Sequence, residues 1–373
     1  MINKPIYLDS PNLGNIEKKF LCEAIDSGYV STFGPYTTRF EKEILKLLQT
    51  KNVVSIQNGT AALFMALYEL GIGQGDEVIL PVITFVACAN VIKYLGAKPI
   101  FVDIDFKSWN ISLKKIQQYI TPKTKAIMPV HLYGNPCDMN NLLKIAKENH
   151  LFIIEDATES LLSKYNNQYT GTFGDFGVFS FNGNKLITTG GGGMLVGKQK
   201  KRVNHIRFLI NQAKDEKNAS YHSEVGFNLR LTNIVAALGL AQLKRINDFK
   251  SKKKIFREIY EDTFRKIDEI SLQESYSESD PVWWLNGISI DKKDTSIHMI
   301  QDELKVMGIP TRRLFSPIIE FPCYSVDDKD TFYVAYEKFH NSIILPGSTL
   351  NDEKSIRYVA QQIVYLLTRK KRF

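Results

Sequence analysis

The stretch that decides the fold is Leu151-Phe152-Ile153-Ile154-Glu155-Asp156. Four apolar residues, most of them branched or aromatic, run without a break into two carboxylates. This is the pattern of a short strand buried on both faces of a parallel sheet. In open α/β sheets, ligands bind at the carboxyl ends of the strands. The pattern therefore predicts that Asp156 lies at the ligand-binding edge of such a sheet.

Strand-like and helix-like segments alternate around this stretch through the first two thirds of the chain. The predicted strands are 53–57, 77–80, 98–103, 126–131, 152–156 and 177–181. The predicted helices between them include 61–70, 116–119 and 139–148. Alternation of this kind predicts an α/β fold, with a mostly parallel sheet and helices on both of its faces.

The last third of the chain has a different pattern. Residues 238–267 form a long, charged, amphipathic stretch that we expect to be a helix linking two domains. The remainder contains Trp283-Trp284-Leu285, ends in a predicted helix at 352–367, and is typical of a smaller α+β domain. We therefore predict a large α/β domain over 1–245 and a small C-terminal α+β domain over 246–373. The N-terminal segment is a candidate to pack on the small domain.

A lysine follows the last of the predicted parallel strands. The sequence Phe179-Ser180-Phe181-Asn182-Gly183-Asn184-Lys185 leads to four glycines, Gly190–Gly193. Glycine has no Cβ, so backbone of this kind can approach a bulky anionic group closely. The amine of Lys185 is the group that forms a Schiff base with pyridoxal phosphate (PLP). PLP also needs a carboxylate at its pyridine nitrogen, and Asp156 at the end of another predicted strand can supply it.

A turn nearer the N-terminus can hold a phosphate. Gln57-Asn58-Gly59-Thr60 lies between a predicted strand and a predicted helix. Glycine at the turn and a hydroxyl at the helix start leave backbone N–H groups and the positive end of the helix dipole facing an anion. Each feature also has an ordinary structural interpretation. Lys185 can be a lysine beside a glycine-rich turn, Asp156 a helix N-cap, and Gly59-Thr60 the start of a capped helix.

Taken in order, these segments resemble the DegT/StrS family of nucleotide-sugar aminotransferases, which are PLP enzymes of fold type I. The resemblance runs nearly end to end and rests on several motifs. They are Gly28-Tyr29-Val30-Ser31-Thr32-Phe33-Gly34, Asn58-Gly59-Thr60-Ala61-Ala62-Leu63, Pro81-Val82-Ile83-Thr84-Phe85-Val86-Ala87, Pro129-Val130-His131-Leu132-Tyr133-Gly134, Glu155-Asp156-Ala157, Ser180–Lys185 and Gly226-Phe227-Asn228-Leu229-Arg230-Leu231-Thr232-Asn233. The resemblance implies a large PLP-binding domain with a mostly parallel sheet, followed by a smaller domain.

The resemblance also implies roles for individual residues. Lys185 would bind PLP covalently and then carry protons, and Asp156 would pair with the pyridine nitrogen. Phe85 would stack on the cofactor ring, whereas its ordinary interpretation is a core residue after a strand. Glu159 occupies the position near the ring hydroxyl where relatives carry glutamine or glutamate.

The cofactor phosphate has its own set of implied partners. Gly59, Thr60 and Ser180 would hold it within one subunit, and Asn228 would reach the phosphate of the neighbouring subunit's cofactor. The resemblance therefore implies a homodimer with shared active sites.

Two positions depart from the family pattern. Gly191 stands where many relatives carry an acidic residue after the lysine, and Arg313 stands where relatives often have proline. The first departure concerns local loop contacts and leaves the chemistry of Lys185 intact.

The implied reaction is amino transfer from L-glutamate to C4 of a 4-keto-6-deoxy sugar linked to a nucleoside diphosphate, for surface polysaccharide or glycan biosynthesis. The segment 182–185 with Gly191 is similar to enzymes that aminate UDP-4-keto-6-deoxy-N-acetylglucosamine, on routes to bacillosamine or legionaminic acid. The segment 312–317, with Pro322 and Tyr324, is more similar to perosamine synthases, which use GDP-4-keto-6-deoxymannose. We expect the UDP sugar, with the GDP sugar as the alternative.

Three other classes of protein share parts of this pattern. Relatives that dehydrate sugars with pyridoxamine phosphate replace the lysine by histidine, so Lys185 argues against them. A non-catalytic regulator with the PLP fold is an alternative that the intact pair of Asp156 and Lys185 disfavours. An enzyme that used Gly190–Gly193 as a nucleotide phosphate loop would need Gly-x-Gly-x-x-Gly spacing and a ribose-binding acid, which this segment lacks.

Composition sets further bounds. The 373 residues are 44% hydrophobic and 24% charged, which is the balance of a soluble globular protein. No segment reaches the roughly 18 consecutive apolar residues of a membrane span, and Met1–Pro5 lacks an apolar signal core. The four cysteines show no metal-ligand spacing. We therefore expect a cytoplasmic protein without a metal site, a disulfide framework or a membrane partner.

The net charge of +8 raises the question of a nucleic-acid partner. Much of this charge lies in three local runs: Lys250 with Lys252–Lys254, Lys198 with Lys200–Arg202, and Arg369–Arg372. Solvated helix faces and a chain end explain such runs, so we expect no nucleic-acid partner. A positive field would, however, steer an acidic diphosphate-linked sugar toward the protein.

Overall fold

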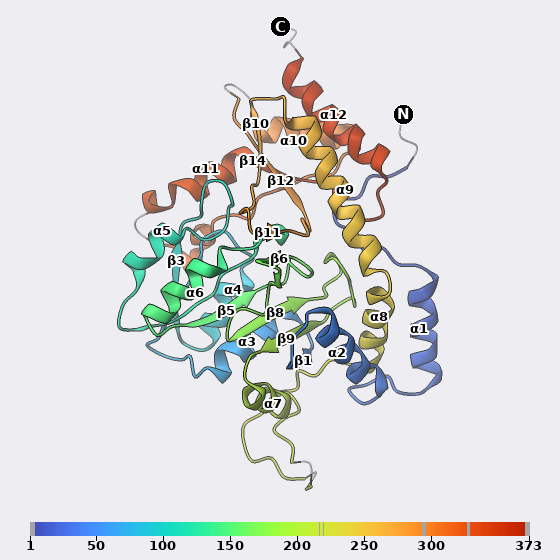
Figure 1. Cartoon of the computed structure of the whole chain (residues 1–373), viewed down its shortest axis with the longest axis vertical. Helices are drawn as coiled ribbons and strands as arrows, with labels where there is room; N and C mark the ends of the chain where they lie inside the picture. Colours follow the sequence, from blue (N-terminus) through green and yellow to red (C-terminus); the bar gives the residue numbers. More distant parts are fainter. Residues whose placement is uncertain (1–3, 216, 219, 293–295, 327–328, 370–373) are drawn as a thin grey trace.

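A seven-stranded sheet forms the centre of the larger part of the molecule (Figure 1). The structure is a computed structural model that describes residues 4–215, 217–218, 220–292, 296–326 and 329–369. The strands lie in the order β1-β9-β8-β5-β4-β2-β3. Their bounds are β1 Val53–Ile56, β2 Glu77–Pro81, β3 Lys98–Val102, β4 Thr124–Ile127, β5 Phe152–Asp156, β8 Phe176–Ser180 and β9 Gly193–Gly197.

The prediction of a mostly parallel sheet is confirmed. Strands β8, β5, β4, β2 and β3 each run parallel to their neighbours in this series, whereas β9 runs antiparallel to both β8 and β1. β9 has no counterpart among the predicted strands, because its glycine-rich start was expected to be flexible. A Cβ on Gly193 would lie 2.6 Å from the carbonyl carbon of Asn58. Glycine at this position therefore serves close packing.

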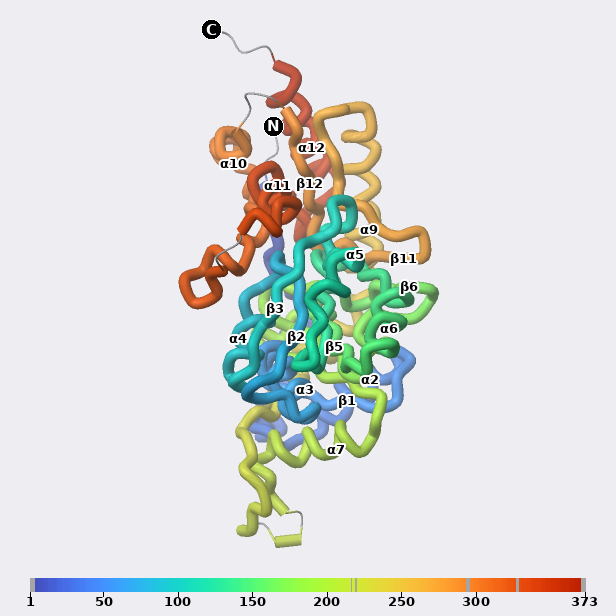
Figure 2. The backbone as a smooth tube through the Cα atoms, turned by 90° about the vertical axis from the view of Figure 1, so that its left-hand side faces the viewer, coloured from blue at the N-terminus to red at the C-terminus, as the bar shows by residue number. Residues whose placement is uncertain are grey.

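Helices cover both faces of this sheet, and Figure 2 shows α4 and α6 on opposite sides of it. Val78 and Leu80 of β2 belong to the buried cluster that includes α3 and α4, whereas Ile79 between them belongs to the cluster that includes α6. This alternation is the strand period of two. The helices of this part are α1 Asn15–Asp26, α2 Pro35–Leu47, α3 Gly59–Glu69, α4 Ala87–Tyr94, α5 Leu113–Ile116, α6 Met139–Glu148, α7 Lys200–Leu209 and α8 Asn233–Leu243.

A second, antiparallel sheet lies in the C-terminal part of the chain, with the strand order β10-β12-β14-β13. Its side chains and those of α9, α10 and α12 form a separate buried cluster. The elements are α9 Ile246–Phe264, β10 Ile270–Leu272, β12 Asn286–Ile290, α10 Ile297–Val306, β13 Arg312–Arg313, α11 Tyr333–Asn341, β14 Ser342–Leu345 and α12 Glu353–Thr368.

Smaller elements connect these two parts. A three-stranded sheet pairs β6 Lys164–Tyr165 with β7 Gln168–Tyr169 and β11 Ser279–Asp280. Short 3-10 segments occupy Gln117–Tyr119, Leu132–Gly134, Ile318–Glu320, Pro322–Tyr324 and Asp330–Phe332.

The stretch 238–267 contains two helices, so the prediction of one long linking helix is wrong. α8 ends at Leu243 and α9 begins at Ile246, and Arg245 between them has a ψ of 1°, outside the helical range. The guanidinium of Arg245 pairs with Glu17 at 2.9 Å, which ties this break to α1. The predicted domain boundary after residue 245 falls at the break, and we propose it as the division between 1–245 and 246–373.

The N-terminal segment lies against the C-terminal part of the chain. The N–H of Tyr7 donates to the side chain of Asn351 at 2.9 Å, and the amide of Asn351 donates to the Tyr7 carbonyl at 2.7 Å. The N–H of Gly347 donates to the carbonyl of Leu8 at 2.8 Å. These contacts hold the N-terminal segment against the loop between β14 and α12.

The expectations about membrane spans, metal sites and disulfides can be compared with the described residues. Within them, no helix is long and apolar enough to cross a membrane, no group of three or more His, Cys, Asp or Glu side chains could hold a metal ion, and the four cysteines are free. The interpretation of the lysine run on α9 as a solvated face is wrong for Lys253, which is 3% exposed. Residues 370–372 of the terminal basic run lie outside the described residues.

Candidate active site

Four of the predicted site residues, Asp156, Glu159, Ser180 and Lys185, lie at the carboxyl edge of the parallel strands. β5 ends at Asp156, the neighbouring β8 ends at Ser180, and the loop after β8 carries Lys185. Glu159 lies in the loop after β5, with its Oε1 atom 3.5 Å from Nζ of Lys185. Parallel strands end at the same edge of a sheet, so two loops that are separate in the sequence come together here.

Asp156 is a buried carboxylate with two hydrogen-bond donors. The N–H of Thr158 donates to Oδ1 at 3.0 Å, and the thiol of Cys88 donates to Oδ2 at 2.9 Å. Burial raises the pKa of Cys88 well above its usual value, and the charge of Asp156 adds to this effect, so the sulfur keeps the proton that it donates. Thr158 and Cys88 thus hold the buried carboxyl group of Asp156 in place at the end of β5.

The amine of Lys185 lies between a carboxylate and an aromatic face. Besides Glu159, its Nζ atom contacts the ring of Trp284, whose centroid is 4.2 Å away. The indole N–H of Trp284 donates to the carbonyl of Asn184 at 2.8 Å, which fixes the loop immediately before the lysine. The lysine side chain is 14% exposed, so its amine is shielded but still accessible.

Glu159 is oriented by the segment around Tyr133. The N–H of Tyr133 donates to Oε2 of Glu159 at 2.8 Å. Burial raises the pKa of Glu159, and the charge of Lys185 opposes the shift. Tyr133 has a φ of 57°, in the left-handed region that is rare for bulky residues. Its hydroxyl accepts from the N–H of Phe315 at 3.3 Å, which joins the site to the C-terminal part of the chain.

The N-terminus of α3 lies against the end of β8. A Cβ on Gly59 would lie 3.1 Å from Cβ of Ser180 and 3.3 Å from Cγ2 of Thr158, so glycine lets helix and strand approach closely. Among the hydrogen bonds of the described residues, the N–H groups of Gly59 and Thr60 have no partner. They stay available to an anion at the positive end of the helix.

Phe85 lies at the exposed end of a series of aromatic rings. It is 57% exposed, which does not fit a core residue, and its ring centroid lies 6.1 Å from that of Phe315. Phe315 stacks on Tyr133 with the centroids 5.5 Å apart, and Tyr133 lies 6.3 Å from Trp284. The series ends at Lys185, so ring contacts join the exposed Phe85 to the lysine, and its predicted role of covering the cofactor ring stays a prediction.

Asn228 lies apart from the other predicted residues. It is exposed, its backbone forms a bridge with Asn211, and the carbonyl of the next residue, Leu229, accepts from the N–H of Gln57 at 2.9 Å. Within the described chain, no hydrogen bond joins Asn228 to Lys185 or Asp156. Its predicted role concerns the neighbouring subunit and stays a prediction.

Three residues at the site were not predicted from the sequence as site residues: Cys88, Trp284 and Asp9. The carboxylate of Asp9 accepts from the side chain of Asn184 at 3.0 Å and from Arg312 at 2.9 Å. In the sequence, Cys88 is one of four scattered cysteines, and Trp284 belongs to an apolar run of the predicted small domain. Their contacts join positions far apart in the chain, so no local pattern carries a signal for them.

Neither departure from the family pattern removes a contact of Lys185. A Cβ on Gly191 would meet nothing within 4 Å, so this position faces open space. Arg313 turns toward α10 and α11. Its guanidinium bonds to His298 at 2.8 Å and lies 4.7 Å from the centroid of the Phe339 ring.

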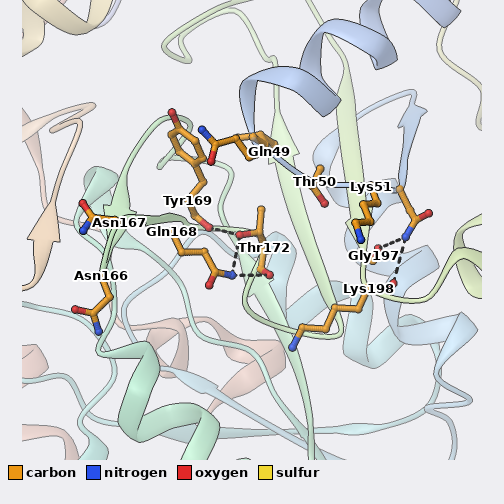
Figure 3. A pocket seen from close by; sticks show the side chains of 12 residues that line it. Gln49, Thr50, Lys51, Asn166, Asn167, Gln168, Tyr169, Thr172, Gly197 and Lys198 are labelled. Carbon is orange, nitrogen blue, oxygen red and sulfur yellow. Dashed lines mark hydrogen bonds between the residues drawn. The ribbon is translucent and has the colours of Figure 1, made fainter.

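A separate surface cavity of about 400 Å³ lies away from this site (Figure 3). Its lining includes Asn52 just before β1 and Gly197 at the end of the antiparallel β9. Val53 pairs with Val196, so both residues mark the amino edge of the parallel strands. Asp156 and Lys185 lie at the opposite edge, and the cavity is therefore not part of the candidate active site.

The residues at the carboxyl edge fit PLP. Lys185 offers an accessible amine, Asp156 a buried carboxyl group held by two donors, and Gly59 and Thr60 offer N–H groups that have no partner among the described residues. These are the three kinds of group that PLP requires: a Schiff-base lysine, an anion at the pyridine nitrogen and a phosphate cradle. Phe85 offers the face of a ring beside them.

Comparison with known proteins agrees with this chemistry. The sequence model of the DegT/DnrJ/EryC1/StrS aminotransferase family matches residues 11–364. A GDP-perosamine synthase of Escherichia coli O157:H7 is 39% identical over 96% of this chain and 97% of its own length. A UDP-N-acetyl-3-dehydro-α-D-glucosamine 3-aminotransferase of Acidithiobacillus ferrooxidans is 39% identical over 55% of this chain and 56% of its own length.

A solved structure shows the same fold. The sugar aminotransferase Spr1654 of Streptococcus pneumoniae, described as putative, matches in its PLP form with a TM-score of 0.90 and 26% identity, over 96% of this chain and 98% of its own. Its PMP form matches with the same TM-score.

Replacing Cys88 tests the support of Asp156. Cys88→Ala leaves Oδ2 of a buried carboxylate without its donor, so we expect the free energy of unfolding to fall by about 1–3 kcal/mol. Cys88→Ser keeps a donor and is expected to retain most of the stability. Urea unfolding of the PLP-free protein measures both. Equal stability of wild type and Cys88→Ala would contradict this account of Asp156.

The raised pKa of Glu159 predicts a pH dependence of stability. A carboxyl group whose pKa is raised on folding stabilises the fold in its protonated form, and this contribution is lost as the pH rises from the usual 4.5 through the raised value. Glu159→Gln cannot lose a proton. We therefore expect the stability of the PLP-free variant relative to wild type to increase as the pH rises from 4 upward. The measurement is urea unfolding of both proteins across this range. A difference in their free energies of unfolding that does not change with pH would contradict the raised pKa.

Proposed function

The chain belongs to the DegT/DnrJ/EryC1/StrS aminotransferase family and is a PLP-dependent transaminase, and we propose that its substrates are L-glutamate and a nucleoside-diphosphate-linked 4-keto-6-deoxy sugar. The observation that carries this proposal is the placement of Lys185 beside the buried Glu159, at the carboxyl edge of the sheet where the buried Asp156 also lies. An amine between an acid and an aromatic face is suited to proton transfer in a shielded site.

We assign each contact of the cofactor to a residue of this cluster. Bound PLP supplies a ring that accepts the electron pair left when a carbon beside the amino group loses its proton. Asp156, which two donors hold in place, would pair with the pyridine nitrogen. Glu159 would lie at the ring hydroxyl and Phe85 at the ring face. Gly59, Thr60 and Ser180 would hold the phosphate.

Lys185 carries the protons of both half-reactions. In the first, its Nζ would take the α-proton of glutamate, which gives its amino group to the bound cofactor and, with an oxygen from water, leaves as 2-oxoglutarate. In the second, the amino group would replace the keto oxygen at C4 of the sugar, which leaves as water, and the same Nζ would deliver a proton to C4. The contacts with Glu159 and Trp284 keep Nζ in one place for both steps.

We propose GDP-4-keto-6-deoxymannose as the sugar acceptor. A relative that is 39% identical over nearly the whole chain is named GDP-perosamine synthase, and the segment 312–317 is similar to such enzymes. The UDP sugar expected from the sequence is therefore placed second. One observation favours it: the relative named for a UDP sugar is equally identical, but over about half of the chain. The product would be an amino sugar for a surface polysaccharide or glycan.

We also propose a homodimer in which Asn228 completes the site of the neighbouring subunit. Apolar side chains near Asn228 are unusually exposed, with Val225 at 81% and Phe33 at 69%. The guanidinium of Arg230 lies 5.4 Å from the centroid of the Phe33 ring, which joins the two segments into one surface. Exposed apolar surface of this kind is typical of a protein interface.

The absorbance of PLP tests the central residue. Wild-type protein supplied with PLP is expected to show a visible band that bleaches when L-glutamate is added. Lys185→Ala is expected to lack both the band and the bleaching, because it lacks the amine that binds the cofactor. GDP-4-keto-6-deoxymannose is expected to restore the bleached band. Absence of a band in wild type would contradict the site, and restoration by UDP-4-keto-6-deoxy-N-acetylglucosamine alone would contradict the GDP assignment.

Mixing two inactive variants tests the shared site. Lys185→Ala lacks the cofactor lysine and Asn228→Ala lacks the contact to the neighbouring subunit. Half of the dimers in an equal mixture are mixed and have one intact site, so about a quarter of wild-type activity is expected after subunit exchange. The measurement is the rate of 2-oxoglutarate formation with the sugar present. Activity no higher than the mean of the separate variants would contradict a shared site.

A further inference from the structure

A buried lysine lies outside the set of residues assigned to the reaction. Lys253 of α9 is 3% exposed, although its neighbours in the lysine run are more exposed. Burial lowers the pKa of Lys253 to about 7, and the charge of Asp9 opposes this shift. Burying an amine that can be charged is unfavourable unless its hydrogen bonds are satisfied. The contacts of Lys253 therefore call for an explanation.

Both hydrogen-bond acceptors of Lys253 in the described chain are backbone carbonyls. Its Nζ donates to the carbonyl oxygen of Trp284 at 2.6 Å and to that of Gly347 at 2.6 Å. Trp284 lies just before β12, and Gly347 lies just after β14. One amine thus ties α9 to two segments that lie outside regular secondary structure.

Trp284 contacts Lys185 and the residue before it. The face of its indole lies 4.2 Å from Nζ of Lys185, and the indole N–H donates to the carbonyl of Asn184 at 2.8 Å. Trp284 therefore supports both the amine and the loop that carries it. Because the indole is 2% exposed, solvent cannot replace these contacts without rearrangement.

α9 holds the neighbouring tryptophan as well. The guanidinium of Arg257, one helical turn after Lys253, lies 3.8 Å from the centroid of the Trp283 ring. Lys253 and Lys185 also border the same small internal space, together with Asp9 and Asn184. The helix is therefore in contact with the support of the site at more than one point.

We propose that Lys253 is a positioning residue for Lys185. Its amine fixes the carbonyl of Trp284, and the indole of Trp284 in turn fixes the amine of Lys185 and the loop before it. Lys253 acts through Trp284 and not by contact with the substrate or cofactor. The inference rests on the proposed function, in which Lys185 binds PLP.

Lys253→Met removes the donor and keeps the length of the side chain. In the PLP-loaded variant we expect the pH midpoint of the visible band to move. We also expect kcat to fall on the order of tenfold to a hundredfold, with little change in KM. In the PLP-free variant we expect a changed near-ultraviolet circular dichroism spectrum, because Trp284 loses its anchor. If Lys253 served stability alone, its substitution would lower the melting temperature and leave the pH midpoint of the visible band unchanged.

Lys252→Met is the matched control. Lys252 lies on the same helix and donates to the carbonyl oxygens of Thr349 at 2.7 Å and Asn351 at 3.4 Å, in the segment that follows Gly347. It has no described contact with Trp284. We expect this variant to keep the wild-type midpoint, kcat and near-ultraviolet spectrum. Equal effects of the two substitutions on all three would overturn the proposal.

Trp284→Phe tests the same path from its other end. Phenylalanine keeps an aromatic face but loses the N–H that holds Asn184, so the midpoint and kcat are expected to shift as in Lys253→Met. If Lys253→Met cannot be purified, Trp284→Phe tests the proposal by itself. A wild-type pH midpoint and kcat in Trp284→Phe would then overturn the proposal. A wild-type protein without the visible band would contradict the proposed function. A normal wild-type band whose pH midpoint is unchanged in Lys253→Met and in Trp284→Phe would contradict this inference alone.

Discussion

The buried carboxylate of Asp156 is the constraint on which the rest of the site depends. A buried carboxyl group needs hydrogen-bond partners, and here they come from Thr158 after β5 and from Cys88 on α4. Meeting this need fixes α4 against the end of β5. The N–H of Cys88 also donates to the carbonyl of Phe85 at 3.2 Å. The first turn of α4 therefore positions both Asp156, which is proposed to pair with the pyridine nitrogen, and Phe85, which is proposed to cover the cofactor ring.

The lysine side of the site is supported from the distant ends of the chain. Asp9 binds both Asn184 and Arg312, while Trp284 contacts Lys185 and Asn184. The N-terminal segment, the loop after β8 and the C-terminal part thus converge on one amine. This arrangement also brings two cations near the buried Glu159. The charges of Lys185 and Arg312 oppose the larger effect of burial, which raises the pKa of Glu159.

The sequence predicted the parallel strands and the residues that follow them, because buried strands and turn residues leave a local pattern. The helix at 139–148 has the predicted bounds, and β5 ends at Asp156 as expected. β9 was missed because its glycines suggest flexibility, whereas they allow close packing. The roles of Cys88, Trp284 and Lys253 could not be predicted. Each depends on a contact between residues far apart in the chain, and the lysine run on α9 has the composition of a solvated face.

The most direct test of the account is to locate the cofactor on the protein. PLP-loaded wild type would be treated with borohydride, which reduces a Schiff base to a stable amine, then digested and analysed by mass spectrometry. The account predicts that the reduced cofactor is found on the peptide containing Lys185, at that residue. Reduced cofactor on a different lysine, or on none, would contradict the assignment of the carboxyl edge as the active site.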